Sequence, residues 1–147
     1  MTDVRRRYMP PLSPTTGART VLIVDDYVDA LDVWAIYLGA EGFRVLTAST
    51  GREALAIAGV ELPDLIVLDL DLPDLSGFEV ARELRSQAAT RAIPLIAATG
   101  FSHAVHQDRA RASGFNAVLV KPCAPDALVG EIHRLLAAHR AQSPPPI

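Results

Sequence analysis

Polar side chains that could together handle a phosphoryl group and a metal ion follow four short apolar runs of this chain. These residues are Asp25, Asp26, Asp69, Thr99 and Lys121. Three carboxylates brought close together repel one another at neutral pH unless a cation compensates them. Mg²⁺ suits that position, because it binds through one or two carboxylates and leaves other positions for water and phosphate oxygens.

Asp69 is the candidate nucleophile of this set. A carboxylate can attack phosphorus and form an aspartyl phosphate without a separate general base. Lys121 would then offer an ammonium, and Thr99 a hydroxyl, to the oxygens of the transferred group. We also predict a cis peptide bond between Lys121 and Pro122, which would direct the ammonium into the crevice where the carboxylates lie.

The elements that must position these residues are five apolar runs rich in Val, Ile and Leu, which are typical of buried strands in a parallel sheet. The predicted strands cover residues 20–24, 43–48, 65–69, 93–98 and 116–120. Apolar residues at helical spacing predict a helix after each strand. These helices are expected over residues 28–40, around 54–58, and over 78–87, 103–113 and 125–139.

The alternation of strand and helix indicates an α/β domain, doubly wound around a five-stranded parallel sheet as a flavodoxin-like three-layer sandwich. We expect the strand order 2-1-3-4-5, because crossovers are right-handed and the candidate residues follow strands one, three, four and five. Ligands bind at the carboxyl ends of the strands in such a sheet, so Asp25, Asp69 and Lys121 are expected to meet there.

The 147 residues suffice for one domain, which we expect over residues 19–140. A basic, proline-containing leader over residues 1–18 and a proline-rich tail over residues 141–147 are expected to be flexible. The net charge is −3, with the arginines at positions 5–7 making the leader positive and the remainder acidic. That distribution argues against nucleic-acid binding, which needs a patterned basic face.

Two further features of composition bear on where the protein works. No apolar stretch approaches the roughly 20 residues that span a bilayer, so we expect no membrane association. Cys123 is the single cysteine, which excludes an internal disulfide and fits the reducing conditions of the cytoplasm.

The combination of Asp25, Asp26, Asp69, Thr99 and the Lys121-Pro122 pair resembles the receiver domain of bacterial two-component response regulators. The loop over residues 69–77, with its Pro and Gly, resembles that family's loop after the phosphoacceptor, and the likeness extends from about residue 20 to residue 139. It implies a stand-alone receiver in phosphorelay signalling that acts by protein contact and is not a turnover enzyme. No DNA-binding module is expected after Gln142.

The resemblance also implies a role for each matching residue. Asp69 would accept a phosphoryl group from a histidine kinase or a phosphotransfer protein. Asp26, Asp69 and the backbone carbonyl of Asp71 would bind Mg²⁺, with Asp25 helping through water. Lys121 and Thr99 would contact the phosphoryl oxygens.

Two departures from the family pattern concern the output of the signal and the openness of the pocket beside the phosphorylation site. Val118 stands three residues before the lysine, where the family usually has Tyr or Phe, and Gly100 follows Thr99. We expect the lightly anchored helix over 103–113 to respond to phosphorylation. The face formed by that helix, strand five and the last helix, with His103, His106 and Arg109, would then contact an effector protein.

Two other functions remain open from the residues. Asp69-Leu70-Asp71 matches the Asp-x-Asp of haloacid dehalogenase phosphohydrolases, although that family carries it on the first strand and its acidic pair later in the chain. The second alternative is an interaction scaffold that keeps the fold but is not phosphorylated. Val118 favours it, because the usual aromatic residue is missing at that position.

Overall fold

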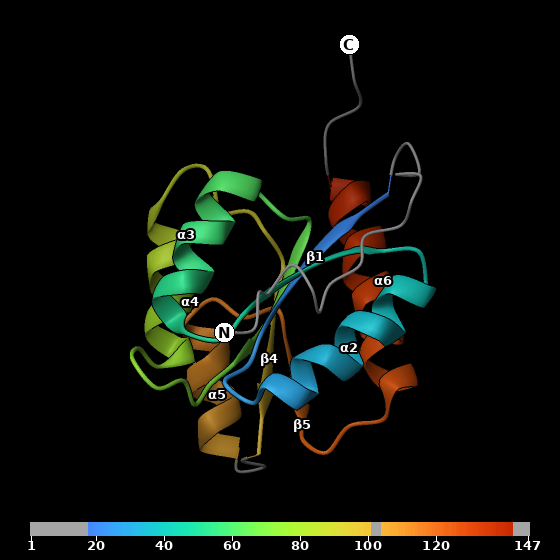
Figure 1. Ribbon diagram of the computed structural model, residues 1–147. Helices are drawn as coiled ribbons and strands as arrows, with labels where there is room; N and C mark the ends of the chain where they lie inside the picture. Colours follow the sequence, from blue (N-terminus) through green and yellow to red (C-terminus); the bar gives the residue numbers. More distant parts are fainter. Residues whose placement is uncertain (1–17, 101–103, 143–147) are drawn as a thin grey trace.

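The computed structural model describes residues 18–100 and 104–142, which form a parallel sheet covered by helices on both faces (Figure 1). The strands are β1 (Thr20–Val24), β2 (Arg44–Ala48), β3 (Leu65–Asp69), β4 (Leu95–Thr99) and β5 (Ala117–Val120). The helices are α2 (Val28–Ala40), α3 (Gly51–Glu61), α4 (Gly77–Ser86), α5 (Ala104–Ala112) and α6 (Pro125–Gln142). The sheet order is β2-β1-β3-β4-β5, which confirms the predicted α/β topology.

Two hydrophobic layers separate the sheet from its helices. Alternate residues of β1 point to opposite faces, as the pleat of a strand requires. Leu22 and Val24 belong to the core under α3, α4 and α5, whereas Val21 and Ile23 belong to the core under α2 and α6. Figure 1 shows the two helical layers on opposite sides of the sheet.

The register of the strands aligns their carboxyl ends. Val24 pairs with Leu68 across β1 and β3, so the residues that follow each of them lie at the same edge of the sheet. Farther along this edge, Asp69 pairs with Ala98 and Thr99 with Val120. The parallel pairing therefore places the ends of four strands around one crevice.

Several predicted bounds differ from those in the structure. Strand β4 begins at Leu95 and includes Thr99, two residues later than predicted at its start, because Pro94 has no N–H to donate to the sheet. Helix α4 covers Gly77–Ser86 and α5 covers Ala104–Ala112, each close to the prediction, whereas α6 continues to Gln142.

Some predictions concern parts of the chain that lie outside the described residues. They are the leader, the tail after Gln142, and the side chains of His103 and His106. Within the described part, no helix combines the length and the hydropathy that crossing a membrane requires.

Candidate functional site

Three carboxylates cluster at the carboxyl edge of the sheet. One oxygen from each of Asp25, Asp26 and Asp69 can be chosen so that the three lie within 4.8 Å of one another. Asp25 and Asp69 are 4% and 7% exposed, whereas Asp26 is exposed. The juxtaposition follows from the register, because β1 and β3 are neighbours and end at the same level.

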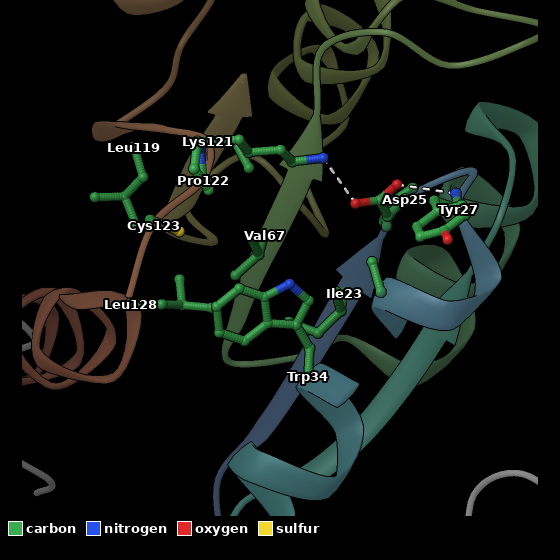
Figure 2. Close-up of a pocket in the computed structure, with 13 residues that line it drawn as sticks. Ile23, Asp25, Tyr27, Trp34, Val67, Leu119, Lys121, Pro122, Cys123 and Leu128 are labelled. Atoms are coloured by element: carbon green, nitrogen blue, oxygen red, sulfur yellow. Dashed lines mark hydrogen bonds and ion pairs between the residues drawn. The ribbon is translucent and has the colours of Figure 1, made fainter. Parts of the chain in front are cut away.

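Lys121 joins the two buried carboxylates from the far side of the crevice. Its Nζ donates to Asp25 Oδ2 at 2.8 Å and to Asp69 Oδ2 at 3.2 Å, and Figure 2 shows the first of these contacts. The Lys121-Pro122 peptide bond is cis, and the ammonium points into the crevice, as predicted. Lys121 is also the only lysine in the chain.

Backbone N–H groups fix the remaining oxygens of the buried pair. Tyr27 N donates to Asp25 Oδ1 at 2.9 Å, and Asp71 N donates to Asp69 Oδ1 at 3.0 Å. Both bonds run from a residue two positions later, a turn typical of Asp and Asn. Each buried carboxylate thus has one oxygen held by the backbone and one by the lysine.

The electrostatics of the site show the cost of burying these groups. Burial raises the pKa of Asp69, and the charge of Asp25 adds to this, although the Asp71 N–H and the Lys121 ammonium act in the opposite direction. Burial lowers the pKa of Lys121, but the hydrogen bond to Asp25 and the charges of both carboxylates outweigh it, so that this pKa is raised. The lysine therefore remains charged, while the carboxylates are incompletely compensated.

This donor set fits a hard divalent cation. Three carboxylates face a single ammonium, and further positive charge would relieve the repulsion among them. All the side-chain donors are oxygens, as Mg²⁺ prefers, and the exposed Asp26 leaves one side of the cluster open to water.

Thr99 lies beside this cluster at the end of β4. The residue is 1% exposed, and its carbonyl accepts a hydrogen bond from Lys121 N at 2.7 Å. This backbone hydrogen bond fixes Thr99 and Lys121 next to each other. Gly100 is exposed, and a Cβ added there would meet no atom of the described residues within 4 Å.

The loop after Asp69 is braced by contacts that the sequence analysis did not identify. Asp74 accepts hydrogen bonds from Gly51 N at 2.7 Å and Arg52 N at 2.9 Å, so it caps the first turn of α3 from a distant loop. A Cβ on Gly77 would lie 2.4 Å from the carbonyl oxygen of Asp69. Ser76 before Gly77 carries the local signal for the start of α4, but nothing in the sequence near Asp74 indicates that its side chain would reach α3.

A contact between α4 and α5 is also visible only in three dimensions. The Arg109 guanidinium lies 4.1 Å from the centroid of the Phe78 ring, a cation–π contact. Among the described side chains of α5, only Ala110 is buried. Val118, where an aromatic residue was expected from the family pattern, is half-buried and packs against the core that contains Phe78.

Comparison with known proteins identifies relatives over most of the chain. The family model of the response regulator receiver domain matches residues 21–133. The polar-differentiation response regulator DivK of Brucella ovis is 35% identical over 104 residues, which cover 71% of this chain and 85% of DivK.

Solved structures agree with this match. A CheY-like response regulator receiver domain from Methanospirillum hungatei superimposes with a TM-score of 0.81 at 28% identity, covering 86% of this chain and all of that one. The receiver domain of a sensor histidine kinase from Pseudomonas aeruginosa has a TM-score of 0.76 at 28% identity, covering 82% of this chain and 99% of that one. That structure has a magnesium ion coordinated in its active-site cleft.

Proposed function

Because the chain belongs to the response regulator receiver domain family, which works in phosphorelay signalling, we propose that Asp69 is the residue on which it accepts a phosphoryl group. One observation carries this assignment. Asp69 shares the ammonium of Lys121 with Asp25, at 3.2 and 2.8 Å, although the three residues follow or end three different strands. Asp69 is also positioned at the crevice where such folds bind their ligands.

The proposed reaction transfers the group from a phosphorylated histidine. One carboxylate oxygen of Asp69 forms a bond to phosphorus as the bond from phosphorus to the donor imidazole nitrogen breaks. That nitrogen keeps the electron pair of the broken bond. Lys121 donates to an oxygen of the transferred group, and the Thr99 hydroxyl contacts another. Both residues thereby stabilise the charge on the phosphoryl oxygens while the attacking oxygen and the leaving nitrogen stay in line.

Asp25, Asp26, Asp69 and the backbone carbonyl of Asp71 are the ligands we propose for Mg²⁺, which supplies positive charge to the phosphoryl oxygens when bound. Asp25 would contribute through a water molecule. The Asp71 N–H holds Asp69 Oδ1, so the loop orients the same carboxylate that would ligate the ion.

The partners in this proposal are proteins. Receiver domains interact with histidine kinases and phosphotransfer proteins, and one of these would phosphorylate Asp69. The output face consists of α5, β5 and α6, because α5 has the fewest buried side chains among its described residues. The domain over residues 19–140 would act in the cytoplasm, without nucleic acid or membrane, and would not turn over a substrate.

The test is incubation of the full chain with acetyl phosphate and Mg²⁺, followed by intact-protein mass spectrometry. We expect a single phosphoryl adduct that is absent from Asp69→Asn. Asp71→Asn is the matched control, since its backbone carbonyl remains, and it should still acquire the adduct.

This experiment, together with an assay of p-nitrophenyl phosphate hydrolysis, separates the alternatives. An adduct that persists in Asp69→Asn would overturn the assignment of the acceptor. Steady turnover of p-nitrophenyl phosphate would support a phosphohydrolase instead. A chain with no adduct under any condition would act as a scaffold.

A further inference from the structure

An apolar cavity lies next to the carboxylate cluster but extends away from it, between α2 and α6. Its volume is about 450 Å³. Trp34 forms one wall, β3 and β5 provide Val67 and Leu119, and Leu128 of α6 closes the far side (Figure 2). Lys121 and Asp25 are at the end that adjoins the cluster.

The size of this cavity is that of a ligand site and exceeds an ordinary packing defect. The cavity is partly open to solvent, and sites for small molecules usually enclose about 300–1,000 Å³ with mostly apolar walls. The walls here come from two helices and from the floor of the sheet. The cavity is therefore a preformed part of the fold.

The charged groups at its end already make hydrogen bonds and ion pairs within the protein. Asp25 uses one oxygen for Tyr27 N and the other for Lys121. Lys121 in turn contacts two carboxylates. A ligand with a net charge would have to compete with these bonds, whereas an uncharged ligand leaves them intact.

One uncharged donor remains available. Among the described residues, the indole N–H of the half-buried Trp34 has no hydrogen-bond partner. Figure 2 shows the indole nitrogen on the edge of the ring that faces Lys121 and Asp25. A molecule with a hydrogen-bond acceptor at this position would receive a bond from this N–H, which would orient it against the apolar walls.

From these features we infer that the cavity binds an uncharged, largely apolar small molecule of about two rings that accepts a hydrogen bond from Trp34. The inference is independent of phosphorylation at Asp69, because it rests on the walls, the volume and the indole donor.

The probe for this inference is 6-propionyl-2-dimethylaminonaphthalene, an uncharged two-ring ketone whose emission reports the polarity around it. Trp34 is the only tryptophan, so energy transfer from it measures proximity to the cavity. We expect saturable one-to-one binding to the full chain, with quenched Trp34 emission and blue-shifted probe emission. 2-Dimethylaminonaphthalene, which lacks the carbonyl acceptor, should bind several-fold more weakly.

Ala30 lines the cavity on α2, and Ala30→Leu should fill part of it and weaken probe binding at least tenfold. Ala40→Leu, an exposed substitution on the same helix, is the matched control and should bind as the natural chain does. Contacts between probe protons and the methyl groups of Val67 and Leu119, observed by NMR in the natural chain, test the location without any variant.

Three results would overturn the inference. The first is an absence of saturable binding, which would be seen if another segment or a second copy of the chain filled the cavity. The second is equal affinity of Ala30→Leu and the natural chain for the probe. The third is equal affinity of the natural chain for the probe and for the compound without the carbonyl. Mass spectrometry of the phosphoryl adduct remains a separate measurement, so failure here and failure of the Asp69 assignment are distinguishable.

Discussion

The ammonium of Lys121 lies 2.8 Å from a carboxylate oxygen of Asp25, a residue 96 positions earlier in the chain. The same ammonium reaches Asp69 on the neighbouring strand. One cation therefore holds together two buried carboxylates that would otherwise repel each other. This arrangement makes the stability of the fold depend on the groups proposed for phosphoryl transfer.

Replacing Lys121 with Ala should destabilise the protein in the absence of divalent cations. The substitution leaves Asp25 and Asp69 buried without their ammonium, which costs several kcal/mol in a dry interior. Since the Lys121 side chain is 34% exposed, solvent screening reduces the expected loss to about 1–3 kcal/mol. Urea unfolding in EDTA measures this change.

Mg²⁺ should partly restore the stability of Lys121→Ala. Added Mg²⁺ should stabilise this variant more than the natural chain, because the cluster then carries one more uncompensated negative charge. Arg82→Ala removes an exposed positive charge and should change stability by less than about 0.5 kcal/mol. Equal losses in the two variants would show that the ion pair at the site contributes nothing.

Gly77→Ala should disturb the backbone of Asp69. The added Cβ would lie 2.4 Å from the Asp69 carbonyl oxygen and 2.7 Å from Leu70 Cα, and backbone atoms of a buried strand end cannot move away cheaply. We expect a loss of about 1–3 kcal/mol or more in the free energy of unfolding. The rate of phosphorylation by acetyl phosphate should fall with it.

Gly130→Ala provides the matched control for that substitution. Gly130 lies within α6, is exposed, and has no atom within 4 Å of an added Cβ. Alanine should therefore stabilise the helix by about 0.5–1 kcal/mol. A similar effect of both substitutions would contradict the proposed close contact at Gly77.

Asp74 should contribute to the free energy of unfolding at neutral pH, and this contribution should be lost at acidic pH. The hydrogen bond from Arg52 N, together with that from Gly51 N, outweighs the effect of burial and lowers the pKa of Asp74 below its usual range. A lowered pKa in the folded state stabilises the protein above the unfolded pKa, and this contribution is lost as the pH falls through the folded value. The loss is thus expected below about pH 4.

Comparison of the natural chain with Asp74→Asn measures this contribution. Near pH 7 the natural chain should be the more stable of the two, and the difference should shrink as the pH falls below about 4. A difference that is constant with pH would show that the Asp74 charge does not support the first turn of α3.

Cys123 should react slowly with alkylating reagents at neutral pH. Burial raises the pKa of the Cys123 thiol, so less of the reactive thiolate is present at a given pH. The rate of alkylation by iodoacetamide should reach half its maximum at a higher pH in the folded chain than in urea. Because Cys123 is the only cysteine, the total rate reports this residue alone, and coincident pH profiles would contradict the prediction.

Much of the architecture could be predicted because its signals are local. The strand from Leu65 to Asp69 consists of apolar residues that are buried on both faces, and such runs read directly as central strands of a parallel sheet. The alternation of these runs with helical periodicity then limits the topology to few alternatives. The same pattern predicts which polar residues stand at the ends of the strands, and that they meet at the carboxyl edge of the sheet.

The contacts within that edge were decided by tertiary structure. The sequence predicted that Lys121 would turn into the crevice. That its ammonium contacts both Asp25 and Asp69 depends on the register of β1 with β3. Asp74 at the start of α3 and Arg109 over Phe78 join segments with no common local signal. The cavity beside Trp34 likewise depends on how α2 and α6 pack.

The sequence by itself thus determined the strands, the helices and the residue types at the carboxyl edge, because strand and helix periodicity act over a few neighbouring positions. The sheet order followed from right-handed crossovers and from which strands those residues end. Only the tertiary structure decided which oxygen meets which ammonium and where space remains. Those distances come from the packing of segments far apart in the chain, such as Asp25 and Lys121, and no local pattern encodes them.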